Sequence, residues 1–276
     1  MTSSIPWRIA LFQGPAESGG VARNLELLET TARKAADQGA RLLICPEMFL
    51  TGYNIGSEAA RRLAEPVDGP SARRAAAIAT ENGIALLYGY PEQRPDGRVY
   101  NAALLLDDHG QRLANYRKTH LFGDLDHAMF EAGAEPVVTA ELDGLRIGIL
   151  ICYDVEFPEN VRMLALAGVD IVTVPTALMR PFDIVARNLV PIRAFENQLY
   201  LAYANRCGNE ADLSYCGLSC VVGPDGSDLA RAGGDEALIF ADLSVDALAH
   251  SRRAMTYLRD RRPEIYGSLS DGLSRI

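Results

Sequence analysis

Leu145-Arg-Ile-Gly-Ile-Leu-Ile-Cys152-Tyr-Asp-Val-Glu-Phe-Pro158-Glu-Asn160 carries the strongest structural signal in this chain. Its apolar, β-branched first half predicts a buried strand, and Pro158 suits the first turn of a helix. A strand that turns sharply into a helix presents one side chain at the sheet edge and directs free backbone N–H groups at whatever that side chain attacks. Cys152 stands at this turn and is a candidate nucleophile, although packing is the better explanation of a free Cys considered alone.

Strands and helices alternate on both sides of this stretch. The apolar periodicity predicts two β-α-β units, then two hairpins, and then helix–strand pairs up to a last hairpin at Pro224-Asp-Gly226. We therefore expect the α/β class and a single domain over residues 1–276, with a peripheral helical tail from about residue 245. The predicted strands are 8–13, 41–45, 84–90, 99–106, 112–117, 145–152, 169–174 and 199–204, with Asn24 and Ser71 as N-caps of the first two helices and further helices after Pro158 and from Asp183.

Composition narrows the functional classes. The chain has 276 residues and a net charge of −9, which argues against a nucleic-acid partner. No apolar run approaches the roughly 18 residues of a membrane span, and Met1–Arg8 lacks a signal-peptide pattern. Five cysteines, an odd number in a long chain, favour a reduced, cytoplasmic protein. Cys216 and Cys220 lack the spacing and the neighbouring His of a zinc site, so no metal is expected.

Three ionisable residues stand where predicted strands end. Glu47 follows the second strand, Lys118 follows the strand 112–117, and Cys152 ends the strand quoted above. Separately, a carboxylate after a strand is usually solvated, and a Lys there commonly protects a sheet edge. The ends of neighbouring strands in α/β sheets are where sites form, so the three residues together predict a pocket.

The sequence around these residues resembles the nitrilase superfamily of carbon–nitrogen hydrolases. The resemblance extends from Arg8 to about Asp242 and depends on three ordered motifs: Cys45-Pro-Glu-Met-Phe-Leu-Thr-Gly-Tyr53, Tyr116-Arg-Lys-Thr-His-Leu-Phe-Gly123 and Ile151-Cys-Tyr-Asp-Val-Glu-Phe-Pro-Glu159. It implies a four-layer α-β-β-α sandwich that often dimerises. It also places the catalytic Glu, Lys and Cys of the family at Glu47, Lys118 and Cys152.

Segments 46–56 and 118–126 of this chain most resemble one branch of this superfamily, which includes 5-aminopentanamidases and R-selective amidases. Nitrilases proper tend to carry Cys-Trp-Glu where this chain has Cys152-Tyr-Asp, which favours amides over nitriles. The resemblance implies an amidase that converts a small aliphatic carboxamide to the acid and ammonia through a cysteine thioester. The narrower candidate is 5-aminopentanamide or a related amino-acid amide. A nitrilase, an N-carbamoyl amine hydrolase and a catalytically silent scaffold are the alternatives.

Further residues are expected around the nucleophile. Many relatives carry a second Glu, and the best-aligned position here is Asp126, with Asp124 and Glu131 as competitors. A substrate with a terminal amine would need an acidic pocket residue, for which Glu210 and Asp212 are candidates. The loops after the strand ends supply the predicted substrate-binding residues, which are Tyr53, Asn54, Tyr153, Thr176 and Ala177.

The predicted mechanism uses no metal or organic cofactor. Glu47 takes the thiol proton of Cys152, and Lys118 with the backbone N–H of Tyr153 stabilises the oxyanion. Lys118 and Glu47 act on the thiol in opposite directions, so we expect a resting thiol, with Lys118 keeping Glu47 ionised. The expected partners are a small amide substrate and further copies of the chain, as a homodimer or higher homo-oligomer, with no nucleic acid and no membrane.

Overall fold

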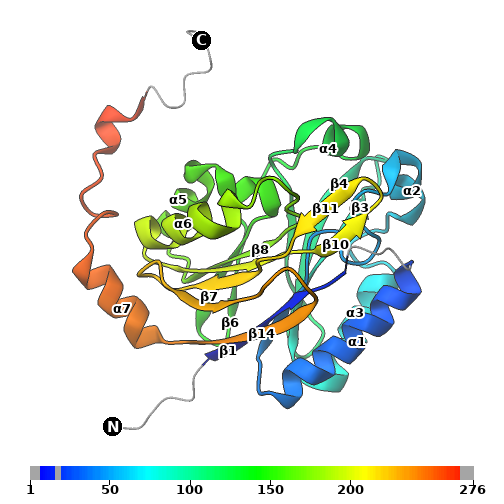
Figure 1. The fold of residues 1–276 in the computed structure, drawn as a ribbon, viewed down its shortest axis with the longest axis horizontal. Coiled ribbons are helices and arrows are strands. Elements are labelled where there is room, and N and C mark those ends of the chain that lie inside the picture. The colour runs from blue at the N-terminus through cyan, green and yellow to red at the C-terminus, as the bar shows by residue number, and fades with distance from the viewer. Residues whose placement is uncertain (1–6, 16–19, 268–276) are drawn as a thin grey trace.

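Two six-stranded sheets packed against each other form the body of the protein (Figure 1). The structure is a computed structural model and describes residues 7–15 and 20–267, so most of the amino-terminal segment examined for a signal peptide lies outside the described residues. In spatial order the first sheet contains β14 (Ala237–Leu243), β1 (Trp7–Gln13), β2 (Leu42–Ile44), β3 (Ala85–Gln93), β4 (Val99–Leu106) and β5 (Arg112–Arg117). The second contains β13 (Asp228–Arg231), β12 (Cys220–Val222), β9 (Tyr200–Ala204), β8 (Ile171–Pro175), β7 (Leu145–Ile149) and β6 (Thr139–Leu142).

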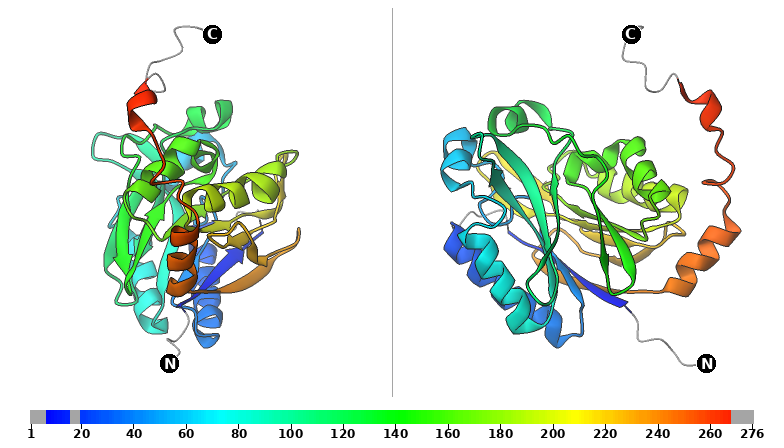
Figure 2. Two further views of the ribbon diagram at one scale, coloured as in Figure 1. Left: turned by 90° about the vertical axis from the view of Figure 1, so that its left-hand side faces the viewer. Right: turned by 180° about the vertical axis from the view of Figure 1, so that it is seen from behind.

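Helices cover the outer face of each sheet, α1 and α3 on the first and α5 and α6 on the second (Figures 1 and 2). Two further strands, β10 (Cys207–Glu210) and β11 (Leu213–Cys216), form a separate hairpin, and shorter helices complete the fold. The helices are α1 (Val21–Asp37), α2 (Gly56–Leu63), α3 (Pro70–Asn82), α4 (Gly123–Met129), the 3-10 turn η1 (Cys152–Glu156), α5 (Pro158–Leu166), the π-helical turn η2 (Val185–Leu189), α6 (Val190–Asn197), α7 (Val245–Ala254) and the 3-10 turn η3 (Pro263–Ile265). This arrangement confirms the α/β class and the four-layer α-β-β-α sandwich.

The side-chain alternation along each strand explains why two apolar layers form. In β1, Ile9 and Leu11 point between the sheets, whereas Ala10 and Phe12 point towards α1 and α3. The parallel order β1-β2-β3 and the parallel order β7-β8-β9 place the carboxyl ends of these strands on one side of the sandwich. Glu47 follows the end of β2, Cys152 follows the end of β7, and Lys118 follows β5, the second strand of a hairpin.

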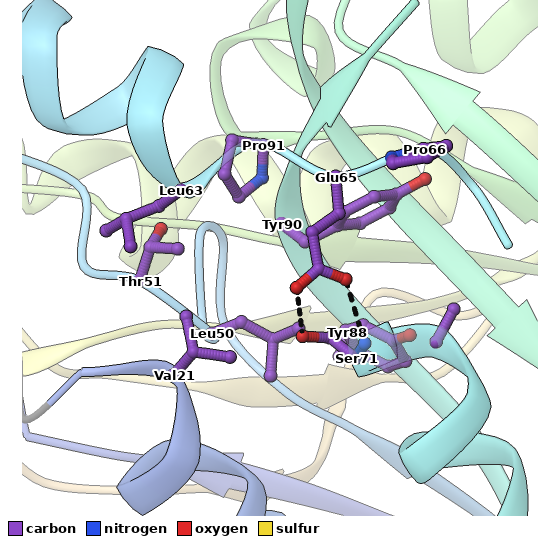
Figure 3. Close-up of a pocket in the computed structure, with 11 residues that line it drawn as sticks. Val21, Leu50, Thr51, Leu63, Glu65, Pro66, Ser71, Tyr88, Tyr90 and Pro91 are labelled. Carbon is purple, nitrogen blue, oxygen red and sulfur yellow. Dashed lines mark hydrogen bonds between the residues drawn. The ribbon is translucent and has the colours of Figure 1, made fainter. Parts of the chain in front are cut away.

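Two predicted helix caps are wrong. Asn24 lies inside α1, where its side-chain amide donates to the Leu50 carbonyl at 2.8 Å, because the helix begins earlier, after Gly20. Ser71 lies in the first turn of α3, which begins at Pro70. The Glu65 carboxylate accepts hydrogen bonds from the backbone N–H and the hydroxyl of Ser71, both at 2.8 Å (Figure 3). Glu65, six residues before Ser71, therefore caps α3, whereas Asn24 holds a loop 26 residues later and caps no helix.

The last elements run along the outside of the body, beyond β14 (Figure 2). Helix α7 matches the helical tail expected from about residue 245. Arg252 attaches it to the second sheet, since its guanidinium donates to the Asp170 carboxylate at 2.9 Å and to the Val169 carbonyl at 2.8 Å. Within residues 7–15 and 20–267, no helix has the length and the apolar character that crossing a membrane requires.

Candidate active site

Glu47, Lys118 and Asp126 form a buried ion cluster at the strand ends. The Lys118 Nζ lies 2.8 Å from Glu47 Oε1 and 2.6 Å from Asp126 Oδ2, and all three side chains are 0% exposed. Asp126 reaches this position because α4 begins directly after the loop that follows Lys118, and its carboxylate also accepts the Phe122 N–H at 2.9 Å. Of the three acids considered from the sequence, only Asp126 contacts Lys118, since Asp124 and Glu131 are exposed.

The Glu47 carboxylate has one oxygen in use and one without a partner. Oε1 accepts from Lys118 and, at 2.7 Å, from the Asn101 side-chain amide. Oε2 is buried and has no hydrogen-bond partner among the described residues. A buried carboxylate oxygen without a hydrogen bond costs free energy, and a catalytic role is one reason for a protein to keep it. Oε2 is the oxygen of Glu47 that is free to accept a proton.

The backbone at Glu47 is held in place by distant parts of the chain. Met48 has a φ of 49°, and the Arg206 guanidinium donates to the carbonyls of Glu47, at 3.0 Å, and Met48. Gly89 in β3 lies so close that a Cβ on it would come within 2.3 Å of the Met48 nitrogen. The turn that presents Glu47 is therefore strained and tightly enclosed, as functional backbone often is.

Cys152 has a similarly constrained backbone. It begins η1 with a φ of 48°, a conformation that is uncommon for a residue other than glycine. Its side chain is 8% exposed. Thr176 and Ala177 follow β8. The hydroxyl of Thr176 and the backbone N–H of Ala177 lie beside the Cys152 thiol and favour its ionised form. The strand-to-helix turn thus presents the thiol at the sheet edge, and both residues predicted after Pro175 contact it.

Burial dominates the proton affinities at this site. It raises the pKa of the Cys152 thiol well above its ordinary value, Glu47 raises it further, and Lys118 lowers it. Burial alone would lower the pKa of Lys118, but the carboxylates of Glu47 and Asp126 raise it well above its ordinary value. The predicted resting thiol agrees with these directions.

Lys118 acts on Glu47 in the expected direction, favouring the ionised carboxylate, but burial acts more strongly in the opposite direction. Burial raises the pKa of Glu47 above its ordinary value; Lys118 lowers it and Asp126 raises it, and burial outweighs the ammonium. A carboxylate with a raised pKa is a stronger base, closer to the pH at which proton transfer is most efficient.

Asp154 connects the Lys118 loop to the Cys152 turn. Its carboxylate accepts the Tyr116 hydroxyl at 2.9 Å, the Thr119 hydroxyl at 2.9 Å and the backbone N–H groups of His120 at 2.9 Å and Ile151 at 3.1 Å. This side chain is 0% exposed. Because one carboxylate ties two segments that are distant in sequence, it determines how the ammonium and the thiol face each other.

A cavity of about 220 Å³ opens above the thiol, with three aromatic rings and one acid in its wall. Tyr153 is the predicted substrate-binding residue that lines it directly. Tyr53 lies beside the ion cluster, with its ring centroid 5.8 Å from Lys118 Nζ and its hydroxyl without a partner among the described residues. The lining residues are Phe122, Cys152, Tyr153, Glu156, Leu178, Met179 and Phe182.

Asn54, Glu210 and Asp212 do not line this cavity. The Asn54 side chain donates to Asp212 at 2.8 Å. The Glu210 carboxylate accepts the backbone N–H groups of Tyr53 at 3.0 Å and Asn54 at 2.9 Å, and the Tyr215 hydroxyl at 2.6 Å. Glu210 therefore holds the Tyr53 loop.

Sequence reasoning missed three residues of the site. Asn101 interrupts the otherwise apolar strand β4, and this polar residue in a buried strand could have marked it as a site residue. Arg206 follows the end of the predicted strand 199–204, a position where site residues are common, and this signal could have identified it. Glu156 is one of several acids in the Cys152 motif, and nothing in the local sequence distinguishes it from Asp154 or Glu159.

Other cavities in the described part of the chain lie away from Cys152, with volumes of about 370, 500 and 280 Å³. The cavity around Glu65 and Ser71 (Figure 3) has about 10 Å³ of space, roughly that of one water. Within residues 7–15 and 20–267, no three His, Cys, Asp or Glu side chains are grouped so that they could hold a metal ion.

Comparisons with known proteins give one consistent result. The family model described as carbon-nitrogen hydrolase matches residues 8–253. A protein of Pseudomonas protegens named "hydrolase in pqqF 5′ region" is 57% identical over 95% of this chain and 92% of its own length. An (R)-stereoselective amidase of a Pseudomonas species is 36% identical over 96% of this chain and 94% of its own length.

A solved structure gives the same result for the fold. A double mutant of the amidase from Nesterenkonia sp. AN1, in complex with acrylamide, superposes with a TM-score of 0.83. It is 36% identical, and the match covers 96% of this chain and 98% of that one.

Proposed function

The chain belongs to the carbon–nitrogen hydrolase family and is a hydrolytic amidase of the nitrilase superfamily, and from this premise we propose that it cleaves small aliphatic carboxamides through a thioester on Cys152. The observation that carries the proposal is the buried cluster of Glu47, Lys118 and Asp126 beside a strained cysteine at the floor of a cavity. An amide is a poor electrophile with a poor leaving group, so it needs a nucleophile, an oxyanion site and a proton donor.

In the first half of the reaction, Glu47 accepts the thiol proton as Cys152 attacks the carbonyl carbon. Oε2 of Glu47, which has no partner among the described residues, is the acceptor. Lys118 and the backbone N–H of Tyr153 hold the oxyanion that forms. When the carbon–nitrogen bond breaks, the proton on Glu47 passes to the nitrogen, and ammonia leaves.

In the second half, Glu47 removes a proton from water, and the resulting hydroxide attacks the thioester. The carbon–sulfur bond then breaks, the carboxylic acid leaves, and Cys152 regains its proton. Asp126 stays bound to Lys118 throughout and holds its ammonium in place. Raised pKa values keep the resting thiol protonated, so deprotonation is coupled to substrate attack.

The size of the cavity supports a small substrate. The cavity has about 220 Å³, more than the roughly 150 Å³ of an engineered protein cavity that binds benzene, so a small aliphatic amide fits. The solved Nesterenkonia amidase holds acrylamide, a small amide, in its complex. Within this class, 5-aminopentanamide or a related amino-acid amide is the narrower candidate. The homo-oligomeric state and the cytoplasmic location stay predictions.

The test is acyl transfer to hydroxylamine. With butanamide as substrate, we expect the enzyme to release ammonia and, when hydroxylamine is present, to form the hydroxamate, because hydroxylamine intercepts a thioester. The Cys152→Ala variant is the control. Ammonia from butyronitrile but not from butanamide would replace the amidase with a nitrilase, and turnover of an N-carbamoyl amine alone would replace it with a carbamoylase.

The pH profile gives a second prediction. Only ionised Glu47 can take the thiol proton, so kcat/KM for butanamide should fall as the pH drops through the pKa of Glu47. Because burial raises that pKa, the acid limb should lie above the ordinary Glu value of about 4.3. The pKa values of Cys152 and Lys118 are raised as well, so no alkaline loss is expected near neutral pH. An acid limb at the ordinary carboxyl value would contradict Glu47 as the base.

A further inference from the structure

The cavity above Cys152 contains a carboxylate that the proposed reaction does not use. Glu156 lies in the same 3-10 turn as Cys152, and its side chain lines the same cavity. Its side chain has no hydrogen bond or ion pair in the described part of the chain, where only its backbone carbonyl accepts one, from Arg193 at 2.8 Å. The Arg193 guanidinium is otherwise bound to the Val155 carbonyl and the Glu196 carboxylate.

The Glu156 carboxylate has no counter-ion bound to it in the described part of the chain. Glu156 is partly buried, and burial raises its pKa above the ordinary value, while the positive charges of Lys118 and Arg193 lower it. Desolvating a carboxylate without a partner costs free energy, which a cation bound nearby would offset.

Three aromatic rings surround the same space. The ring of Phe122 meets that of Tyr153 edge to face at 5.3 Å and that of Phe182 at 5.8 Å. All three side chains line the cavity with Glu156. The faces of aromatic rings attract cations, most strongly where water is excluded, so rings and a carboxylate together form a site suited to an ammonium group.

No basic side chain lines this cavity among the described residues. Lys118 is fully buried outside the cavity lining, and two carboxylates, Glu47 and Asp126, already contact its ammonium. A substrate with a carboxylate at its far end would therefore meet Glu156 with no cation to bind it, and like charges in a partly buried site repel.

We propose that Glu156 selects amides that carry an ammonium group, which its carboxylate binds among the rings of Phe122, Tyr153 and Phe182. This inference rests on the proposed function, because the amide carbonyl must lie at Cys152 for the far end to reach Glu156. It also replaces Glu210 and Asp212, which sequence reasoning offered for this role.

The test compares three amides of similar length. They are 5-aminopentanamide, which is a cation, hexanamide, which is neutral, and adipic monoamide, which is an anion. The wild-type enzyme should prefer the cation. Glu156→Gln should lower kcat/KM for 5-aminopentanamide about 10- to 100-fold, the range for a hydrogen bond to a charged group, and change hexanamide by less than about threefold. Glu156→Asp, which keeps the charge, should restore part of the preference.

Glu159→Gln is the matched control. It removes the same charge from an exposed position that does not line this cavity, so the ratio between the two amides should stay at the wild-type value. A ratio that stays unchanged in Glu156→Gln overturns the inference, whatever the rate with hexanamide.

A binding measurement distinguishes failure of the ammonium site from failure of the proposed amidase reaction. Calorimetry with 5-aminopentanamide and the Cys152→Ala protein needs no turnover. Adding Glu156→Gln to that protein should weaken binding by the same 10- to 100-fold. If the wild type hydrolyses none of the three amides while this loss is observed, the amidase reaction is wrong and the ammonium site is right. Equal binding to both proteins overturns the ammonium site.

Discussion

Replacing Cys152 by alanine is expected to abolish amide hydrolysis, with kcat falling by at least about 10⁴-fold. Among the described residues, the Cys152 thiol is the only nucleophilic side chain that combines a strained turn, a place in the cavity wall and electrostatic interaction with both Glu47 and Lys118. The protein should stay folded, since losing one buried sulfur typically changes the free energy of unfolding by about 1 kcal/mol. Ammonia release and urea unfolding measure the two effects.

Cys220→Ala is the matched control for this variant. Cys220 is a fully buried thiol in β12, paired with β9 and remote from the cavity lining. Its removal should cost a similar amount of stability and leave kcat unchanged. Measurable turnover in a homogeneous preparation of Cys152→Ala would refute the thioester mechanism.

Replacing Lys118 by alanine is expected to damage both chemistry and stability. Losing one oxyanion donor typically lowers kcat about 10²- to 10³-fold, with a smaller effect on KM because the interaction strengthens only in the transition state. Glu47 and Asp126 would remain 0% exposed without a cation, and removing one partner of a buried pair typically costs about 3–5 kcal/mol. Steady-state kinetics and urea unfolding test the two parts.

The loss of stability in Lys118→Ala should depend on pH, and its sign follows from linkage. Lys118 lowers the pKa of Glu47, so without the ammonium the folded-state pKa of Glu47 rises further above its unfolded value. The variant is then least destabilised at low pH, where Glu47 is protonated, and loses stability as the pH rises through the folded-state pKa of Glu47. A destabilisation that is the same at every pH would contradict a role for Lys118 as the counter-ion of Glu47.

Arg117→Ala separates stability from catalysis. Arg117 precedes Lys118 and pairs at 2.7 Å with Glu92, which is 1% exposed, so its removal also leaves a buried carboxylate without its cation. This variant should lose stability and keep kcat, measured where both proteins are folded. If Lys118→Ala keeps its turnover number as well, Lys118 takes no part in the reaction.

Local signals account for most of the fold that was predicted correctly. The β4–β5 hairpin, the turn at Asp143-Gly144 and the start of α5 at Pro158 are specified by residues adjacent in sequence. The elements that were not predicted depend on distant partners. Strand β14 is a strand because it pairs with β1, more than 200 residues earlier, and α4 forms around a buried Asp126 bound to Lys118.

Sequence alone predicted the amidase class, because Glu47, Lys118 and Cys152 lie in motifs short enough to recognise and at strand ends that periodicity reveals. The folded structure was needed to show which of three acids contacts Lys118, and which acid lines the cavity beside Cys152. Asp126 and Glu156 differ from Asp124, Glu131 and Glu210 in what surrounds them and not in residue chemistry or local pattern. Burial and charge pairing are set by segments far apart along the chain, so those assignments require the folded molecule.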